Sequence, residues 1–142
     1  MLPDVNVLVY AHRSDAERHT DYRAWLERIV AGDELYGIAD IVLSGFIRIV
    51  THPRVFVDPT PAADAISFCD ALRSQPAATV LAPGPRHWGL FTDLCAKTGA
   101  RGNLVPDAYL AALAIETGSE WITTDRDYRR FDGLKLRHPL DG

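Results

Sequence analysis

The sequence predicts a single-domain α/β protein, an α/β/α sandwich with a central, mostly parallel sheet. Short apolar segments rich in β-branched residues alternate with longer segments of helical periodicity along all 142 residues. This alternation is typical of a parallel sheet covered by helices. A chain of this length most simply forms one domain, residues 1–142, and no repeat, low-complexity tract or linker interrupts it.

The strands of the predicted sheet are short. The first lies in an apolar segment, residues 2–9, which we expect to form a buried strand that ends near Asp4, with Asn6 beginning the turn beyond it. A buried strand at 121–124 runs straight into Asp125. The remaining strands are expected at 34–38, at 79–81 and, as an edge strand, at 134–136.

Helical periodicity marks the segments between these strands. Helices are expected at 17–30, 40–50, 60–74 and 85–98, and a further helix starts near Asp107 and stops at Gly118. Thr60 is the expected N-cap of the third of these helices, followed by Pro61 in its first turn. Most aromatic side chains at helical spacing are expected in the core: Tyr22, Trp25, Phe46, Phe68, Trp88 and Phe91.

Composition narrows the class of protein. The N-terminal segment lacks the basic start and long apolar run of a signal peptide, and no apolar run reaches the ~20 residues of a membrane-spanning helix. Cys69 and Cys95 are expected to be core thiols in a reducing cytoplasm. The net charge of −4 excludes a global basic field, but not a nucleic-acid enzyme whose clustered acids are neutralised by metal.

Four acids from distant parts of the chain are predicted to meet at one edge of the sheet. Asp4 and Asp40 follow the first two strands, Asp107 opens a helix, and Asp125 follows the late strand. Side chains beyond the carboxyl ends of parallel strands share the functional edge of such a fold. Clustered carboxylates repel unless cations lie between them, and oxygen ligands suit Mg²⁺ or Mn²⁺. Metal-dependent phosphodiester hydrolysis is the reaction class implied.

Each acid also has a structural explanation. Asp107 suits the positive end of a helix dipole, Asp40 suits an N-cap, and Asp125 suits a turn. Asp4 is harder to explain in this way, because a buried and unpaired carboxylate within an apolar segment is costly. The functional interpretation therefore depends on all four acids sharing one edge.

Three segments resemble the PIN-domain nucleases, and specifically the VapC toxins of bacterial toxin–antitoxin pairs. They are PDVNVLVYA, IVLSGFIRIVTHPRVF and VPDAYLAALAIETGSEWITTDRDYRRF. The resemblance covers nearly the whole chain and implies a Mg²⁺-dependent endoribonuclease that cuts structured RNA such as tRNA or rRNA. It also implies inhibition by a cognate VapB-type antitoxin, a homodimer, and a cytoplasmic protein with no membrane partner.

Residue by residue, Asp4, Asp107 and Asp125 match the first, third and fourth acids of the family. The resemblance gives them the catalytic and metal-binding roles. Thr123 and Thr124 precede the last acid, where a hydroxyl can orient that acid or a water.

Asn6 matches a position where the family often has a small polar residue beside the metal, and Asp127 matches a frequent additional acid. The chain departs from the family pattern at the second acid: the Glu expected three residues before Arg48 is Gly45. Asp40, at the start of the same helix, is the nearest carboxylate that could replace it. Arg48 is expected to pair with one of the acids.

Loop arginines near the predicted edge are candidates for contact with RNA phosphates: Arg13, Arg101 and Arg126. For each of them a solvated surface arginine is the alternative. Aromatic residues of the first helices could instead form a dimer face or a groove for an amphipathic antitoxin helix.

Two other function classes stay open at this point. A catalytically silent PIN scaffold that binds RNA or protein is compatible with the missing Glu at Gly45. A receiver-like phosphoacceptor domain also combines an α/β fold with clustered acids and Mg²⁺. That class needs a lysine past a late strand, and neither Lys97 nor Lys135 follows a suitable strand end.

Overall fold

The computed structural model describes residues 1–141, whose strands form two parallel groups. The first group has the order β1 (Leu2–Pro3), β4 (Trp121–Ile122), β5 (Leu136–Arg137), and the second pairs β2 (Tyr36–Ala39) with β3 (Ala78–Leu81). The amide of Gly37 donates to the Met1 carbonyl at 2.6 Å, so β2 lies beside β1. The combined order is β3-β2-β1-β4-β5, and the predicted α/β class with a parallel sheet is confirmed.

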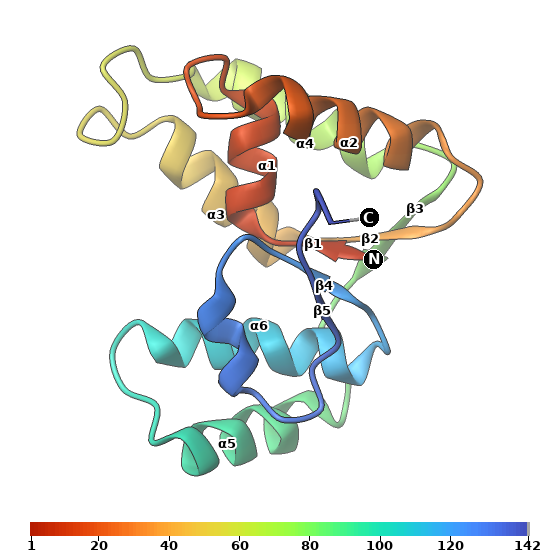
Figure 1. Ribbon diagram of the computed structural model, residues 1–142, viewed down its shortest axis with the longest axis vertical. Helices are drawn as coiled ribbons and strands as arrows, with labels where there is room; N and C mark the ends of the chain where they lie inside the picture. Colours follow the sequence, from red (N-terminus) through yellow and green to blue (C-terminus); the bar gives the residue numbers. More distant parts are fainter. Residues whose placement is uncertain (142) are drawn as a thin grey trace.

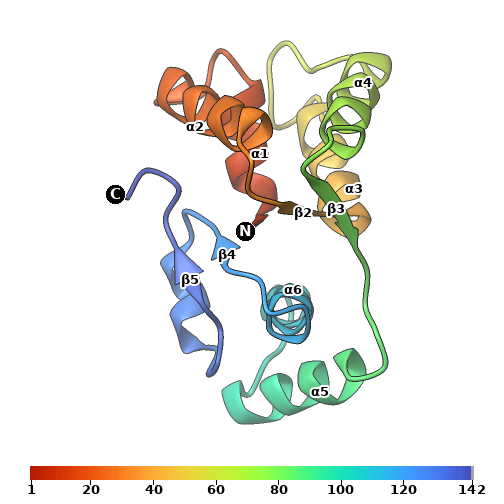
Figure 2. The ribbon, with the colours of Figure 1, turned by 90° about the vertical axis from the view of Figure 1, so that its right-hand side faces the viewer.

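Helices cover both faces of this sheet (Figures 1 and 2). In Figure 1 the first four helices lie above the strands and the last two lie below them. The chain winds from β1 through β2 to β3 in one direction, then returns past β1 to β4, which places the later helices on the opposite face. The helices are α1 (Val5–His12), α2 (His19–Ala31), α3 (Asp40–Val50), α4 (Ala62–Arg73), α5 (His87–Thr98) and α6 (Leu104–Glu116), with the 3₁₀ helix η1 (Arg126–Arg130) after β4.

The first strand ends just before Asp4, close to the predicted end, but Asn6 lies in the first turn of α1, a helix that the sequence did not predict, rather than in a turn after a strand. Asp4 has extended backbone angles and caps α1, because its Oδ1 atom accepts a hydrogen bond from the Val5 amide at 2.6 Å. The apolar residues that follow bury the helix between α2 and α3. A short apolar run of this kind cannot be told from a buried strand by periodicity alone.

Two smaller expectations were wrong. Thr60 does not cap α4, which begins after Pro61 without a side-chain cap. Instead the Thr60 hydroxyl bonds to His12 Nε2 at 3.1 Å and accepts from Arg13 at 3.2 Å. Trp88 is 69% exposed rather than in the core.

Leu2, Trp121 and Ile122 are fully buried at the centre of the sheet, so the strands that carry the predicted acids are fixed by the core. Among the described residues, no helix combines the length and apolar character needed to cross a membrane.

Candidate functional site

The centre of the sheet brings together two strand ends that are distant in the sequence. β1 and β4 are parallel neighbours, with Pro3 opposite Ile122. The chain leaves β1 into α1 on one face and leaves β4 into η1 on the other (Figure 1). In open α/β sheets such a reversal opens a crevice at the carboxyl ends of the strands, where ligands bind. Asp4 directly follows β1, and 123–125 directly follow β4.

Asp4 is the most buried acid of this crevice, with 5% of its surface exposed. While Oδ1 caps α1, Oδ2 accepts a hydrogen bond from the Thr123 hydroxyl at 2.7 Å. The Asn6 side-chain amide bridges both partners, donating to Asp4 Oδ2 at 3.4 Å and to Thr123 Oγ1 at 3.3 Å. The carboxylate of Asp4 is therefore held in one orientation by groups from both strand ends.

The strand end after β4 is tied to the same network. The Thr124 amide donates to Asn6 Oδ1 at 3.4 Å, and the Asp125 amide donates to Thr123 Oγ1 at 3.1 Å. Asp125 in turn begins η1, because its Oδ1 atom accepts from the Asp127 amide at 2.9 Å. Asn6 and the Thr123 hydroxyl thus hold Asp4, and Thr123 also contacts Asp125, whereas Thr124 joins the network through its backbone amide.

Asp107 reaches the site from the first turn of α6. Its Oδ1 atom accepts a hydrogen bond from the hydroxyl of Tyr128 at 3.1 Å. Tyr128 is buried against Trp121 and Phe131, so its hydroxyl is held firmly. Sequence reasoning did not identify Tyr128, and the only signal for it was its position in the stretch that follows the last acid.

Electrostatics show that the three acids act on one another. The pKa of Asp4 is raised to about 6; burial is the largest cause, and the charges of Asp107 and Asp125 act in the same direction. The hydrogen bonds from Thr123 and Val5 oppose this shift. The crevice therefore disfavours its own negative charge, and a cation would relieve that cost.

The surroundings of Asp107 follow the same pattern. Burial raises the pKa of its carboxyl, and the charges of Asp125 and Asp127 act in the same direction, while the Tyr128 hydrogen bond and the charge of Arg130 oppose them. Burial and the nearby carboxylates also raise the pKa of Tyr128, so its hydroxyl stays protonated and remains a donor. Asp127 is exposed and contributes charge at the rim.

The donor set fits a hard, hydrated cation. Within residues 1–141, no three His, Cys, Asp or Glu side chains converge closely enough to form a complete direct ligand set. Mg²⁺ retains several waters and is commonly held by only one or two carboxylates. Carboxylate oxygens flanked by threonine hydroxyls and an asparagine amide suit Mg²⁺ or Mn²⁺ and not a softer metal.

Asp40 does not join these acids, which corrects the expectation that it could replace the missing Glu. It is the first residue of α3, exposed, and forms an ion pair with Arg73 of α4 at 2.9 Å. The carboxyl end of β2 carries it to the sheet edge, but its side chain turns toward α4. Its charge is not among those that shift the pKa of Asp4.

Gly45 faces the start of α1 from α3. A Cβ atom at this position would meet Val5 Cγ2 at 3.1 Å, so a larger residue here needs Val5 to move. Arg48, one turn further along α3, is exposed and forms no ion pair within the described residues. The expectation that it pairs with an acid is not met.

The three candidate arginines differ in their surroundings. Arg13 is engaged within the fold, which argues against a role in RNA binding: its guanidinium pairs with Asp15 at 2.6 Å, donates to the Asp58 carbonyl at 2.7 Å and lies over the Phe56 ring. Arg101 and Arg126 are exposed, in the loop before α6 and directly after Asp125 respectively.

Comparison with known proteins identifies relatives of the whole chain. The PIN domain family profile matches residues 1–134. VapC ribonuclease Mb2897 of Mycobacterium bovis is 52% identical over 139 residues, covering 98% of this chain and 95% of the relative. Ribonuclease VapC25 of Mycobacterium tuberculosis is 40% identical over 140 residues, covering 98% of this chain and 99% of the relative.

Solved structures share the fold at low sequence identity. VapBC2 from Rickettsia felis, solved bound to a DNA fragment from its promoter, superposes with a TM-score of 0.70 at 19% identity, covering 96% of both chains. VapC20 of Mycobacterium tuberculosis, described as a sarcin–ricin loop cleaving toxin, gives a TM-score of 0.67 at 14% identity, covering 94% of this chain and 98% of that one.

Proposed function

This chain belongs to the PIN-domain family and, within it, to the VapC ribonucleases, and on that premise we propose that it is a Mg²⁺-dependent endoribonuclease toxin. The main support for metal dependence is the buried Asp4 carboxylate. Thr123 orients it by a hydrogen bond, and burial and two neighbouring acids raise its pKa. Charge held in a buried crevice at such a cost is typical of a site that binds a cation.

The residues of the chain prepare the site for this chemistry. The Val5 amide and the Thr123 hydroxyl hold Asp4, and the Tyr128 hydroxyl holds Asp107, so little reorganisation is needed when substrate arrives. Asp4, Asp107 and Asp125 would hold Mg²⁺, with most of its waters retained. When bound, the ion supplies charge stabilisation of the phosphate and an activated water for hydrolysis.

We propose structured RNA, such as tRNA or rRNA, as the substrate. The support is the family assignment and the description of VapC20, a structural neighbour, as a toxin that cleaves the sarcin–ricin loop. The net charge of −4 agrees with a local rather than a diffuse attraction for RNA.

Partners follow from the same assignment. We propose a cognate VapB-type antitoxin, because similar structures are complexes of VapB with VapC, and a homodimer as the assembly of the toxin. We also propose that the protein acts in the cytoplasm, where unpaired thiols such as those of Cys69 and Cys95 persist.

A catalytically silent scaffold is the second candidate, favoured by Gly45 in place of a Glu and by the incomplete set of direct ligands among the described residues. The receiver-like alternative is set aside by the family assignment. The two remaining candidates differ in whether the purified protein hydrolyses RNA.

The test is cleavage of a total-RNA pool by purified protein with Mg²⁺ or Mn²⁺, with and without EDTA. Asp107→Asn removes a charge of the crevice, and Asp33→Asn is the matched control at an exposed turn. Cleavage that is lost with EDTA and in Asp107→Asn, but kept in Asp33→Asn, is the expected result. Cleavage that persists through both treatments would overturn the metal-dependent mechanism, and no cleavage with either metal would establish the silent scaffold.

A further inference from the structure

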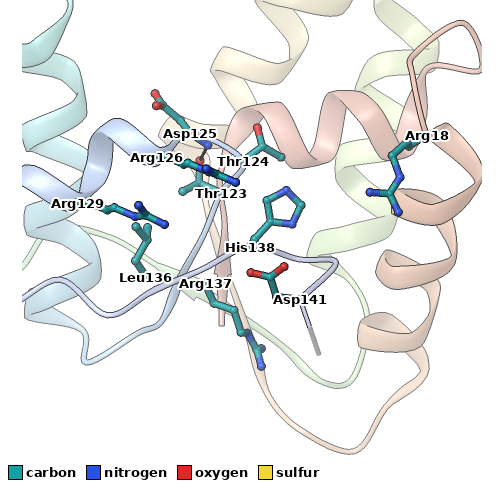
Figure 3. A pocket seen from close by; sticks show the side chains of 10 residues that line it. All are labelled: Arg18, Thr123, Thr124, Asp125, Arg126, Arg129, Leu136, Arg137, His138 and Asp141. Atoms are coloured by element: carbon teal, nitrogen blue, oxygen red, sulfur yellow. Dashed lines mark hydrogen bonds between the residues drawn. The ribbon is translucent and has the colours of Figure 1, made fainter.

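A basic pocket of about 520 Å³ opens beside the acid crevice. One wall is the segment directly after β4, from Thr123 to Asp125, so the pocket and the crevice share a border. The opposite walls come from the segment after β5, including His138, and from Arg18 at the start of α2 (Figure 3). A strand of substrate that lies across the acids would pass over this border into the pocket.

The 3₁₀ geometry of η1 explains why arginines face the pocket. With three residues per turn, side chains at i and i+3 lie on the same face. Tyr128 is buried, and Phe131, three residues later, is buried with it. Arg126 and Arg129 share a second face and both line the pocket. In Figure 3 their guanidinium groups point to the side where the ring of His138 lies, whereas the Asp125 carboxylate points away.

The charges of the pocket are not equally available. Arg18 pairs with Asp21 at 3.0 Å, and Arg137 pairs with Glu120 at 3.1 Å. Neither Arg126 nor Arg129 forms an ion pair or a side-chain hydrogen bond within residues 1–141, and both are exposed. These two guanidiniums therefore form the part of the pocket that can accept an anion without breaking an existing contact.

Two acids line the pocket, Asp125 of the crevice and Asp141. The Asp141 carboxylate lies beside His138 in the pocket (Figure 3), and it does not belong to the crevice of Asp4, Asp107 and Asp125. It lowers the positive potential of the pocket, so its removal would strengthen the attraction for an anion.

We propose that this pocket binds a backbone phosphate of the RNA strand next to the scissile one, with Arg126 and Arg129 as the phosphate-binding residues. The inference rests on the proposed function for the position of the scissile phosphate. Two guanidiniums on one face suit phosphate oxygens, because each presents a planar set of donors. Contacts of this kind set the register of a strand without reading its sequence.

Binding is measured by fluorescence anisotropy with a labelled, single-stranded oligoribonucleotide of mixed sequence, in EDTA so that no cleavage occurs. Arg126→Gln/Arg129→Gln should weaken binding about tenfold or more. It should also reduce the slope of log affinity against log salt by about 0.7, the value for one phosphate of a single strand. Asp141→Asn should tighten binding by roughly twofold or more. Arg28→Gln/Arg54→Gln, a matched loss of two exposed arginines that do not line the pocket, should bind like the parent chain.

Cleavage in Mg²⁺ supplies the second readout: the double arginine variant should raise KM with little change in kcat, because the acids are untouched. Unchanged affinity and KM in both the double arginine variant and Asp141→Asn would overturn the proposal, even if the parent chain cleaves RNA. Conversely, arginine-dependent binding by a parent chain that never cleaves RNA would support the pocket while refuting the proposed nuclease function. Asp141→Asn is expected to increase the affinity for RNA, so it still tests the proposal if the double arginine variant folds poorly.

Discussion

Replacing Asp4 with Asn should stabilise the metal-free protein while abolishing cleavage. The carboxyl is 5% exposed and its pKa rises from 3.8 to about 6 on folding. One pKa unit corresponds to about 1.4 kcal/mol, so ionised Asp4 destabilises the folded state by about 3 kcal/mol near neutral pH. Asn keeps the cap on α1 but offers no acceptor in place of Oδ2 for the Thr123 hydroxyl, a loss of about 1 kcal/mol. The net gain expected is about 2 kcal/mol.

The sign of the pH dependence follows from the direction of the pKa shift. Because the folded-state pKa lies above the unfolded value, the folded protein holds the extra proton between about pH 4 and pH 6. The stability that this proton contributes is present below about pH 4 and is lost as the pH rises through 6. Asp4→Asn should therefore unfold with a flatter pH profile than the parent chain over this window.

The assay is thermal and urea unfolding in EDTA across this pH range, with Asp33→Asn as the exposed-acid control. Near neutral pH the Tm of Asp4→Asn should rise by roughly 5 °C or more, from about 2 kcal/mol in a chain of this size. Added Mg²⁺ should raise the Tm of the parent chain more than that of the variant. An Asp4→Asn variant that is less stable than the parent near neutral pH, in EDTA, would refute the conclusion that ionised Asp4 destabilises the metal-free fold.

Three further outcomes are expected. Tyr128→Phe should fold normally, lower cleavage roughly tenfold and raise the Mg²⁺ concentration needed for activity, because the buried hydrogen bond to Asp107 is worth about 1.5–3 kcal/mol. A titration of activity with Mg²⁺ measures this concentration, and an unchanged value would argue against the role of Tyr128. Asp40→Asn should leave cleavage and Mg²⁺ dependence unchanged, since the side chain pairs with Arg73; a large loss in the same assay would restore it as a metal ligand. Activity should fall as the pH drops through about 6, because protons compete with the cation for Asp4; a pH–rate profile that stays flat to pH 5 would contradict this.

The meeting of Asp4, Asp107 and Asp125 could be predicted from the sequence. Carboxyl ends of parallel strands share an edge. Asp4 directly follows β1, Asp125 lies three residues after the end of β4, and Asp107 lies in the first turn of a helix. The same rule failed for Asp40, because the rule predicts where a residue lies along the strand but not the direction of its side chain. An arginine on α4, distant in sequence, decided that direction.

Other features depended on tertiary contacts that no local pattern reveals. Helix α1 was not predicted because it is buried on several sides and its apolar run has no polar face to mark a helix. Arg13 looked available in a loop, yet it ties the segment before α4 to the end of α1. Tyr128 gained its role from the tight turn that buries its ring and brings its hydroxyl to Asp107.

The five residues of η1 have two separate roles, on different sides of a turn that repeats every three positions. Inserting or deleting one residue would rotate both sides at once: the aromatic ring would leave the interior and the guanidiniums would leave the pocket. Across related chains, this segment should therefore show almost no change in length.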